Sequence, residues 1–198
     1  MEIVWRGDRC VLVRGKQVTV LMDPPEGRLD ADLVTRSARR EPLGPCASVG
    51  GVRVLSGPGE YDVRGVACVG TQTPGATVFS LHLEGVSLAH LGGLTELPDA
   101  ERLAAVAPVD LLIVPVGAGA LGPVAAAEAV TQLEPRVVLP LPLDGDPAAV
   151  EALFRRLGAP LPNARPRLSL TAEGLPESRQ VVLLAAEGRR RASGARAA

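Results

Sequence analysis

The order of strand-like and helix-like segments is the feature that most limits what this chain can fold into. Its first half holds short runs rich in β-branched residues, such as CVLVRG and QVTVLM, and a hairpin with strands at 77–83 and 86–91. After residue 97 the period changes, and helix-like segments alternate with apolar strands such as VDLLIVPVG. So many strands before the first helix fit a doubly wound sheet poorly. The order predicts an α/β (α+β) fold with two mixed sheets packed together and outer helices.

Three helices are expected in the second half of the chain. The segment 98–106 begins with proline and acidic residues, which suits a helix N-terminus. Another helix is expected to begin at Pro147, with Asp146 as its cap. The helix between them begins at Pro123, and its buried face is expected to hold Val124, Ala127, Val130 and Leu133. These helices would supply the outer layer of the fold.

The length and charge of the chain limit its class. With 198 residues it suits one compact domain, which we place at 1–187. The remaining segment 188–198, GRRRASGARAA, is basic and shows no periodicity, so it is predicted to be a disordered tail. A basic tail can touch nucleic acid, but the net charge of -1 argues against a general nucleic-acid binder.

The start of the sequence and its apolar runs predict a cytoplasmic protein with no membrane partner. The start, MEIVWRGDRC, contains the acidic Glu2 and no apolar stretch of the signal-peptide type. The uncharged run 111–127 is interrupted by proline and glycine and falls short of the roughly 18–20 apolar residues that a membrane span needs. Cys10, Cys46 and Cys68 are far apart and form no CxxC pair, so we expect reduced thiols.

An arginine-rich stretch, TRSARREPL, follows the apolar run ADLV and contains Arg36, Arg39 and Arg40. Loops at strand ends often carry the chemistry of α/β proteins. Forked guanidinium groups bind phosphate and carboxylate, so the stretch indicates a site for a small anion. The competing interpretation is a solvated loop whose charge Glu41 partly neutralises.

Seven segments support a family resemblance. In chain order they are VWRGDRCVLVRGKQVTVLMDP, LVTRSARREP, LSGPGEYDVRGV, AHLGGL, VDLLIVPVGAG, QLEPRVVLPLPL and RPRLSLTAEGLPESRQVVLL. Over residues 1–186 the chain resembles small bacterial metal-dependent hydrolases of the metallo-β-lactamase superfamily, of the single-domain UlaG-like type. The resemblance implies an αββα sandwich and, in the family, a hydrolytic centre with two metal ions.

The sequence departs from the family wherever the resemblance implies a metal ligand. Asp8 replaces the histidine of the family motif GHxx, Gly93 replaces the aspartate of HLGD, and Pro142 replaces a late histidine. The loop TQTPGA lacks another expected histidine. The motif HxHxDH falls on residues 38–43, where its ligand positions hold Ala38, Arg40, Pro42 and Leu43. Catalytic zinc needs about three protein donors plus a water. We therefore predict a pseudoenzyme without a metal cofactor, unable to hydrolyse by the family mechanism.

Three hypotheses stay open for the cleft. The first is a binding or structural role, with homo-oligomerisation through exposed sheet edges. The second is a hydrolase site rebuilt from residues that border the cleft: Asp8, Asp23, Glu60 and His90. The third is an anion or nucleic-acid binder that uses Arg36, Arg39 and Arg40. The site residues also have ordinary interpretations, because Asp23 and Glu60 suit turns and His90 suits a hydrogen-bonded core position.

Overall fold

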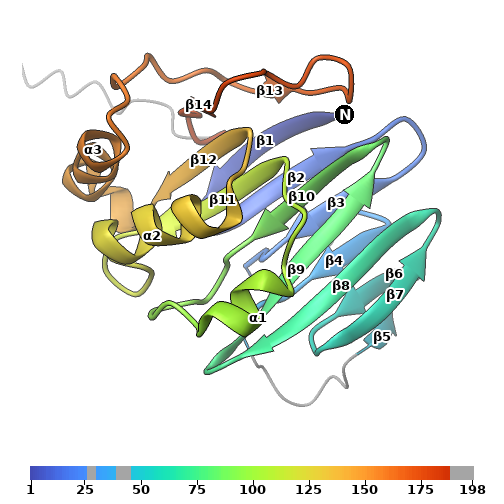
Figure 1. Ribbon diagram of the computed structural model, residues 1–198. Helices are drawn as coiled ribbons and strands as arrows, with labels where there is room; N and C mark the ends of the chain where they lie inside the picture. The colour runs from blue at the N-terminus through green and yellow to red at the C-terminus, as the bar shows by residue number, and fades with distance from the viewer. Residues whose placement is uncertain (26–29, 39–45, 188–198) are drawn as a thin grey trace, which may run out of the picture.

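The computed structural model describes residues 1–25, 30–38 and 46–187, which form two packed β-sheets with three α-helices on one side (Figure 1). The first sheet has the strand order β13-β1-β2-β3-β4-β6-β5, and the second has the order β14-β12-β11-β10-β9-β8-β7. Each sheet contains both parallel and antiparallel neighbours. The predicted pair of mixed sheets with outer helices is therefore confirmed. The predicted tail at 188–198 lies outside the described residues.

The elements have the following bounds. The strands of the first sheet are β1 (Glu2–Gly7), β2 (Cys10–Arg14), β3 (Thr19–Met22), β4 (Leu33–Thr35), β5 (Cys46–Val49), β6 (Val52–Leu55) and β13 (Leu168–Ser169). Those of the second are β7 (Gly59–Val63), β8 (Val66–Thr73), β9 (Ala76–Leu83), β10 (Val86–His90), β11 (Leu111–Val116), β12 (Val137–Pro142) and β14 (Gln180–Val181). The helices are α1 (Ala100–Ala104), α2 (Pro123–Leu133), the 3-10 turn η1 (Leu143–Gly145) and α3 (Pro147–Arg156).

Branched aliphatic side chains fill the space between the two sheets. Alternate residues of each strand point inward, including Ile3 and Val11 from the first sheet and Leu81 and Leu88 from the second. A second apolar cluster joins the outer face of the second sheet to the helices, with Leu112 of β11 against Val130 of α2. Packing on both faces of the second sheet therefore fixes the positions of its strand ends.

The hairpin predicted at 77–83 and 86–91 is present as β9 and β10. Its two-residue turn holds Glu84 with φ 53° and Gly85 with φ 76°. Positive φ at both turn residues matches the twist of the flanking strands. The register pairs Val86 with Leu83 and His90 with Phe79, so the hairpin delivers His90 to the end of the second sheet.

Two helices, α2 and α3, begin at the predicted prolines, whereas α1 is shorter than the predicted 98–106 and begins at Ala100. The Asp99 side chain caps α1, and the Asp146 side chain caps α3 through the Ala148 amide. The prediction for α2 is wrong at Val124, which is 59% exposed, because this residue lies away from the face that packs on the sheet. The face that packs on the second sheet holds Ala126, Ala129, Val130 and Leu133. Among the described residues, no helix has the length and apolar character required to span a bilayer.

Candidate functional site

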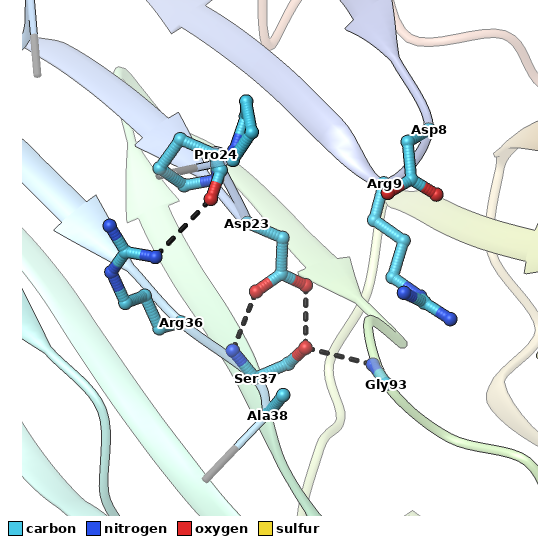
Figure 2. Close-up of a pocket in the computed structure, with 9 residues that line it drawn as sticks. Asp8, Arg9, Asp23, Pro24, Arg36, Ser37, Ala38 and Gly93 are labelled. Atoms are coloured by element: carbon cyan, nitrogen blue, oxygen red, sulfur yellow. Dashed lines mark hydrogen bonds between the residues drawn. The ribbon is translucent and has the colours of Figure 1, made fainter. Parts of the chain in front are cut away.

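A small cleft opens where several strand ends of both sheets meet. Its volume is about 110 Å³. Nine described residues line it: Asp8, Arg9, Asp23, Pro24, Pro25, Arg36, Ser37, Ala38 and Gly93 (Figure 2). They come from the β1–β2 turn, the segments that follow β3 and β4, and the segment after β10. Three of these, Asp8, Ala38 and Gly93, stand at positions where the resemblance expects metal ligands. The cleft is therefore the place where a family metal centre would be sought.

Asp23 holds the segment after β4 against the end of β3. Its Oδ1 accepts a hydrogen bond from the backbone N–H of Ser37 at 2.6 Å, and its Oδ2 accepts one from Ser37 Oγ at 2.5 Å. The Asp23 backbone N–H also donates to the carbonyl of Thr35 at 2.8 Å. The Asp23 side chain is only 11% exposed. Both carboxylate oxygens are thus committed to the chain itself.

Ser37 links the two sheets at the floor of the cleft. Its Oγ accepts a hydrogen bond from the Gly93 N–H at 2.8 Å while donating to Asp23, which uses the hydroxyl in both roles (Figure 2). Its backbone carbonyl accepts from the N–H of Thr77, the second residue of β9, at 2.8 Å. Ser37 follows a strand of the first sheet, whereas Gly93 and Thr77 belong to the second sheet or its loops. We call the chain Asp23–Ser37–Gly93 the serine link.

Gly92 allows this close approach. Its φ is +45°, and a Cβ there would lie 2.3 Å from Ser37 Oγ and 2.7 Å from Asp23 Oδ2. At Gly93 a Cβ would lie 3.4 Å from Ser37 Oγ, which is ordinary van der Waals contact. The two adjacent glycines therefore differ sharply in their tolerance of a side chain.

Gly92→Ala should lower the free energy of unfolding by about 2–3 kcal/mol, because the methyl group overpacks the serine link and the residue must keep a left-handed backbone. Gly93→Ala, the matched control, should change it by less than about 1 kcal/mol. Urea unfolding of both variants measures the difference. Equal losses would contradict the close packing of Gly92 on Ser37.

His90 secures the β1–β2 turn from the opposite sheet. Its Nε2 lies 3.0 Å from the carbonyl oxygen of Arg9, and since a carbonyl only accepts, Nε2 carries the hydrogen. Its Nδ1 lies 3.4 Å from Asp23 Oδ2. Burial lowers the pKa of His90 below its ordinary value, although the charge of Asp23 acts in the opposite direction. His90 is 2% exposed, so it positions the turn and does not face the solvent of the cleft.

Two arginines flank the serine link (Figure 2). Arg9 Nη2 donates to the carbonyl of Gly119 at 2.6 Å, and Arg36 Nη1 donates to the carbonyl of Pro24 at 3.3 Å. Arg9 Nε is buried and has no hydrogen-bond partner within residues 1–25, 30–38 and 46–187. Neither guanidinium forms an ion pair with a carboxylate of the described residues.

The sequence-predicted site residues are only partly brought together. Asp8, Asp23 and Arg36 line the cleft, and His90 contacts Asp23 from beneath it. Glu60 is exposed on the edge strand β7 and does not line the cleft. Arg39 and Arg40 lie outside the described residues.

Sequence reasoning did not single out Arg9 or Ser37. Ser37 stands directly before the position of the HxHxDH motif, and Arg9 stands directly after the position of the GHxx histidine. Their positions directly beside the family motifs are the sequence signal that could have identified them as cleft residues. Neither residue type is a metal ligand, so a search for ligands passes over both.

The described residues do not offer a donor set for a metal ion. Ala38 and Gly93 have no donor side chain, and the oxygens of Asp23 are taken by Ser37. Two guanidinium groups beside them would repel a divalent cation. Across residues 1–25, 30–38 and 46–187, no group of three or more His, Cys, Asp or Glu side chains is placed to hold a metal. The chemistry of these residues does not fit the metal centre that the resemblance implies.

No thiol among the described residues is placed as an activated nucleophile in the cleft. Cys10, Cys46 and Cys68 are free thiols, as expected. Burial raises the pKa of Cys10 to about 11 and that of Cys68 to about 12. Such groups stay protonated near neutral pH, and Cys46 is exposed on the edge strand β5.

A sequence profile of the family described as the Beta-lactamase superfamily domain matches residues 2–142, a range that includes every described residue lining the cleft. The chain belongs to the beta-lactamase superfamily. No protein in a search of functionally curated proteins matches it at a significant level.

Solved structures agree with this family. A protein from Thermotoga maritima, assigned as a Zn-dependent hydrolase of the metallo-β-lactamase superfamily, is 28% identical to this chain. The two structures match with a TM-score of 0.78 over 93% of this chain and 98% of that one. Igni18, a metallo hydrolase from Ignicoccus hospitalis, is 14% identical with a TM-score of 0.61, over 86% and 99% of the two chains. An isothiocyanate hydrolase from Delia radicum gut bacteria is 9% identical with a TM-score of 0.62, over 87% and 100%. The last two similarities concern the fold alone.

Proposed function

We propose that this protein is a superfamily member that has lost its metal centre and acts by binding rather than by metal-dependent hydrolysis. The serine link is the observation that carries the proposal. It places Ser37 and Asp23, bonded to one another, at the floor of the cleft where metal ligands would have to converge. Asp23 is thus one carboxylate held by its own chain, and the lining positions Ala38 and Gly93 add no donor side chain to complete the roughly three that catalytic zinc needs.

The arginines strengthen this proposal. A divalent ion in the cleft would sit near Arg9 and Arg36, two permanent cations that no carboxylate of the described residues pairs with in an ion bridge. Charge repulsion in a partly enclosed site is stronger than in bulk water. Since Asp8 and Asp23 balance these two cations, the described lining has no excess negative charge with which to hold a divalent ion.

Metal content tests the proposal directly. Protein purified without chelator should contain zinc, manganese and iron each far below one per chain, as measured by elemental analysis. Added zinc or EDTA should leave the thermal midpoint unchanged. A bound metal at a hundredfold excess over its dissociation constant would stabilise the protein by about 2.7 kcal/mol, which is a shift of roughly 5–10 °C for a chain of this size. Near-stoichiometric metal would overturn the proposal.

A hydrolase with a rebuilt, metal-free site is the competing function. It would draw on Asp8, Asp23 and His90, which lie in or beneath the cleft. Hydrolysis of generic phosphodiesters or lactones that persists in EDTA and is lost in His90→Ala would favour it. The buried position of His90 and its bond to Arg9 argue for a positioning role instead. Homo-oligomerisation through the open edges at β5 and β7 is a further proposal, which sedimentation analysis tests.

A further inference from the structure

We propose that the cleft binds a small tetrahedral oxyanion, a phosphate group, between Arg9 and Arg36. The inference rests on the proposed function, because the two cations act on a ligand directly only in a cleft without a divalent metal. It extends that function by naming the chemical class of the ligand and by assigning Arg9 to the site.

Unused hydrogen-bond donors are the first argument. A guanidinium carries five N–H donors, yet toward the described residues Arg9 and Arg36 each donate one bond, in both cases to a backbone carbonyl. Arg9 Nε has no hydrogen-bond partner among the described residues and is buried, so a ligand can reach it only after the Arg9 side chain moves. Some arginines of the described residues pair with carboxylates (Arg6, Arg14, Arg64, Arg102 and Arg167), whereas others, such as Arg136 and Arg179, bond backbone carbonyls as Arg9 and Arg36 do. The lining of the cleft, and not the lack of an ion pair alone, therefore distinguishes Arg9 and Arg36.

The carboxylates of the cleft leave these cations available. Both oxygens of Asp23 accept hydrogen bonds from Ser37, and these bonds hold the Asp23 side chain at the floor of the cleft. Asp8 is exposed, so water and salt screen its charge. In Figure 2 Asp8 lies above the Arg9 guanidinium, and the Asp23 carboxylate lies between the two arginines. An anion that contacts both arginines must therefore also approach Asp23, whose charge is partly offset by its two hydrogen bonds from Ser37.

The size and arrangement of the cleft indicate a compact ligand with oxygens on several sides. Its volume of about 110 Å³ is well below the roughly 300–1,000 Å³ of sites for larger organic ligands. The serine link lies between Arg36 on one side and Arg9 on the other (Figure 2). A phosphate group presents oxygens in several directions and can contact both guanidinium forks, whereas the two oxygens of a carboxylate face the same way.

Titration calorimetry with inorganic phosphate tests the inference. Wild-type protein should bind phosphate saturably in the millimolar range or tighter. Arg36→Gln and Arg9→Gln should each weaken binding about tenfold, the effect of losing one charged hydrogen-bonding group. Asp8→Asn should strengthen binding by no more than about twofold, because Asp8 lines the cleft but its charge is screened by solvent. Arg156→Gln, an equal change of charge at an exposed site on α3, is the control and should bind as the wild type does.

Two further measurements test whether the parallel N–H donors of a guanidinium group recognise the phosphate, or whether its positive charge alone is enough. Arg36→Lys keeps the cation but loses the fork, so it should bind phosphate less tightly than the wild type. Acetate should bind more weakly than phosphate. Acetate binding of equal strength, or equal weakening in Arg156→Gln, would overturn the inference, as would the lack of saturable phosphate binding. If Arg9→Gln does not fold, Arg36→Gln and Arg36→Lys decide the outcome.

The metal content of the same samples distinguishes this inference from the proposed function. Metal-free protein that does not bind phosphate would refute the inference and leave the proposed function standing. Phosphate binding that appears only with added zinc and disappears with EDTA would refute both. Phosphate binding by metal-free protein that depends on Arg9 and Arg36 would support both.

Discussion

Asp23→Ala should lower the free energy of unfolding by about 4 kcal/mol. The substitution leaves the N–H and the Oγ–H of Ser37 without their acceptor, and each buried donor left unpaired costs about 1–3 kcal/mol. Alanine at this position must also keep a φ of 45°, which disfavours residues with a Cβ. Denaturant unfolding followed by circular dichroism measures the loss.

Asp23→Asn separates the causes of this loss. Asparagine tolerates the left-handed backbone and keeps one oxygen that can accept from the Ser37 N–H, so it should cost less than half as much as alanine. Asp8→Asn, which changes an exposed carboxylate in the same cleft, should leave stability within about 0.5 kcal/mol of the wild type. If Asp23→Ala were as mild as Asp8→Asn, the serine link would not stabilise the fold.

The triple variant Asp8→His, Ala38→His and Gly93→Asp should acquire zinc at about one ion per chain, since three donors plus a water suffice for a catalytic-type zinc site. All three positions line one cleft. A side chain at Gly93 has room, because its Cβ would meet nothing closer than 3.4 Å. Histidine at position 8 suits the positive φ of 47°. Elemental analysis after dialysis against zinc measures the gain.

A variant of matched size provides the control for this experiment. Asp8→Gln, Ala38→Gln and Gly93→Asn introduce side chains of similar bulk that bind zinc poorly, and this protein should stay metal-free. Zinc should raise the thermal midpoint of the histidine variant alone. A folded histidine variant without zinc would mean that the three positions do not converge as family ligands do.

The order of strands and helices along the chain could be predicted, because each element follows from a local pattern of apolar, turn and capping residues. The turn at Glu84 and Gly85 needs only the two residues themselves to adopt positive φ, and the hairpin follows. The face of α2 could not be predicted equally well. Val124 is the most apolar residue of its first turn, yet alanines at 126 and 129 form the face that packs on the sheet. In an alanine-rich helix, hydropathy barely distinguishes one face from another.

The candidate site was also predictable only in part. Whether a position carries a metal donor depends on residue type alone, so the replacements at Asp8, Ala38 and Gly93 can be read from the sequence. The contacts that occupy the cleft instead join residues far apart in the chain. Ser37 and Gly93 are separated by 56 positions, and Arg9 and Gly119 by 110. No local pattern encodes such pairs, because they arise only when two sheets bring distant strand ends together.

The serine link has a consequence for the cell that produces this protein. In a metalloprotein whose ligands come from different segments, the ion fastens those segments together, and folding then follows the supply of the metal. Here hydrogen bonds between the Ser37 hydroxyl, the Asp23 carboxylate and the Gly93 amide join the segments instead. Under the proposed loss of the metal centre, synthesis alone yields the finished protein, and scarcity of zinc would not reduce its abundance.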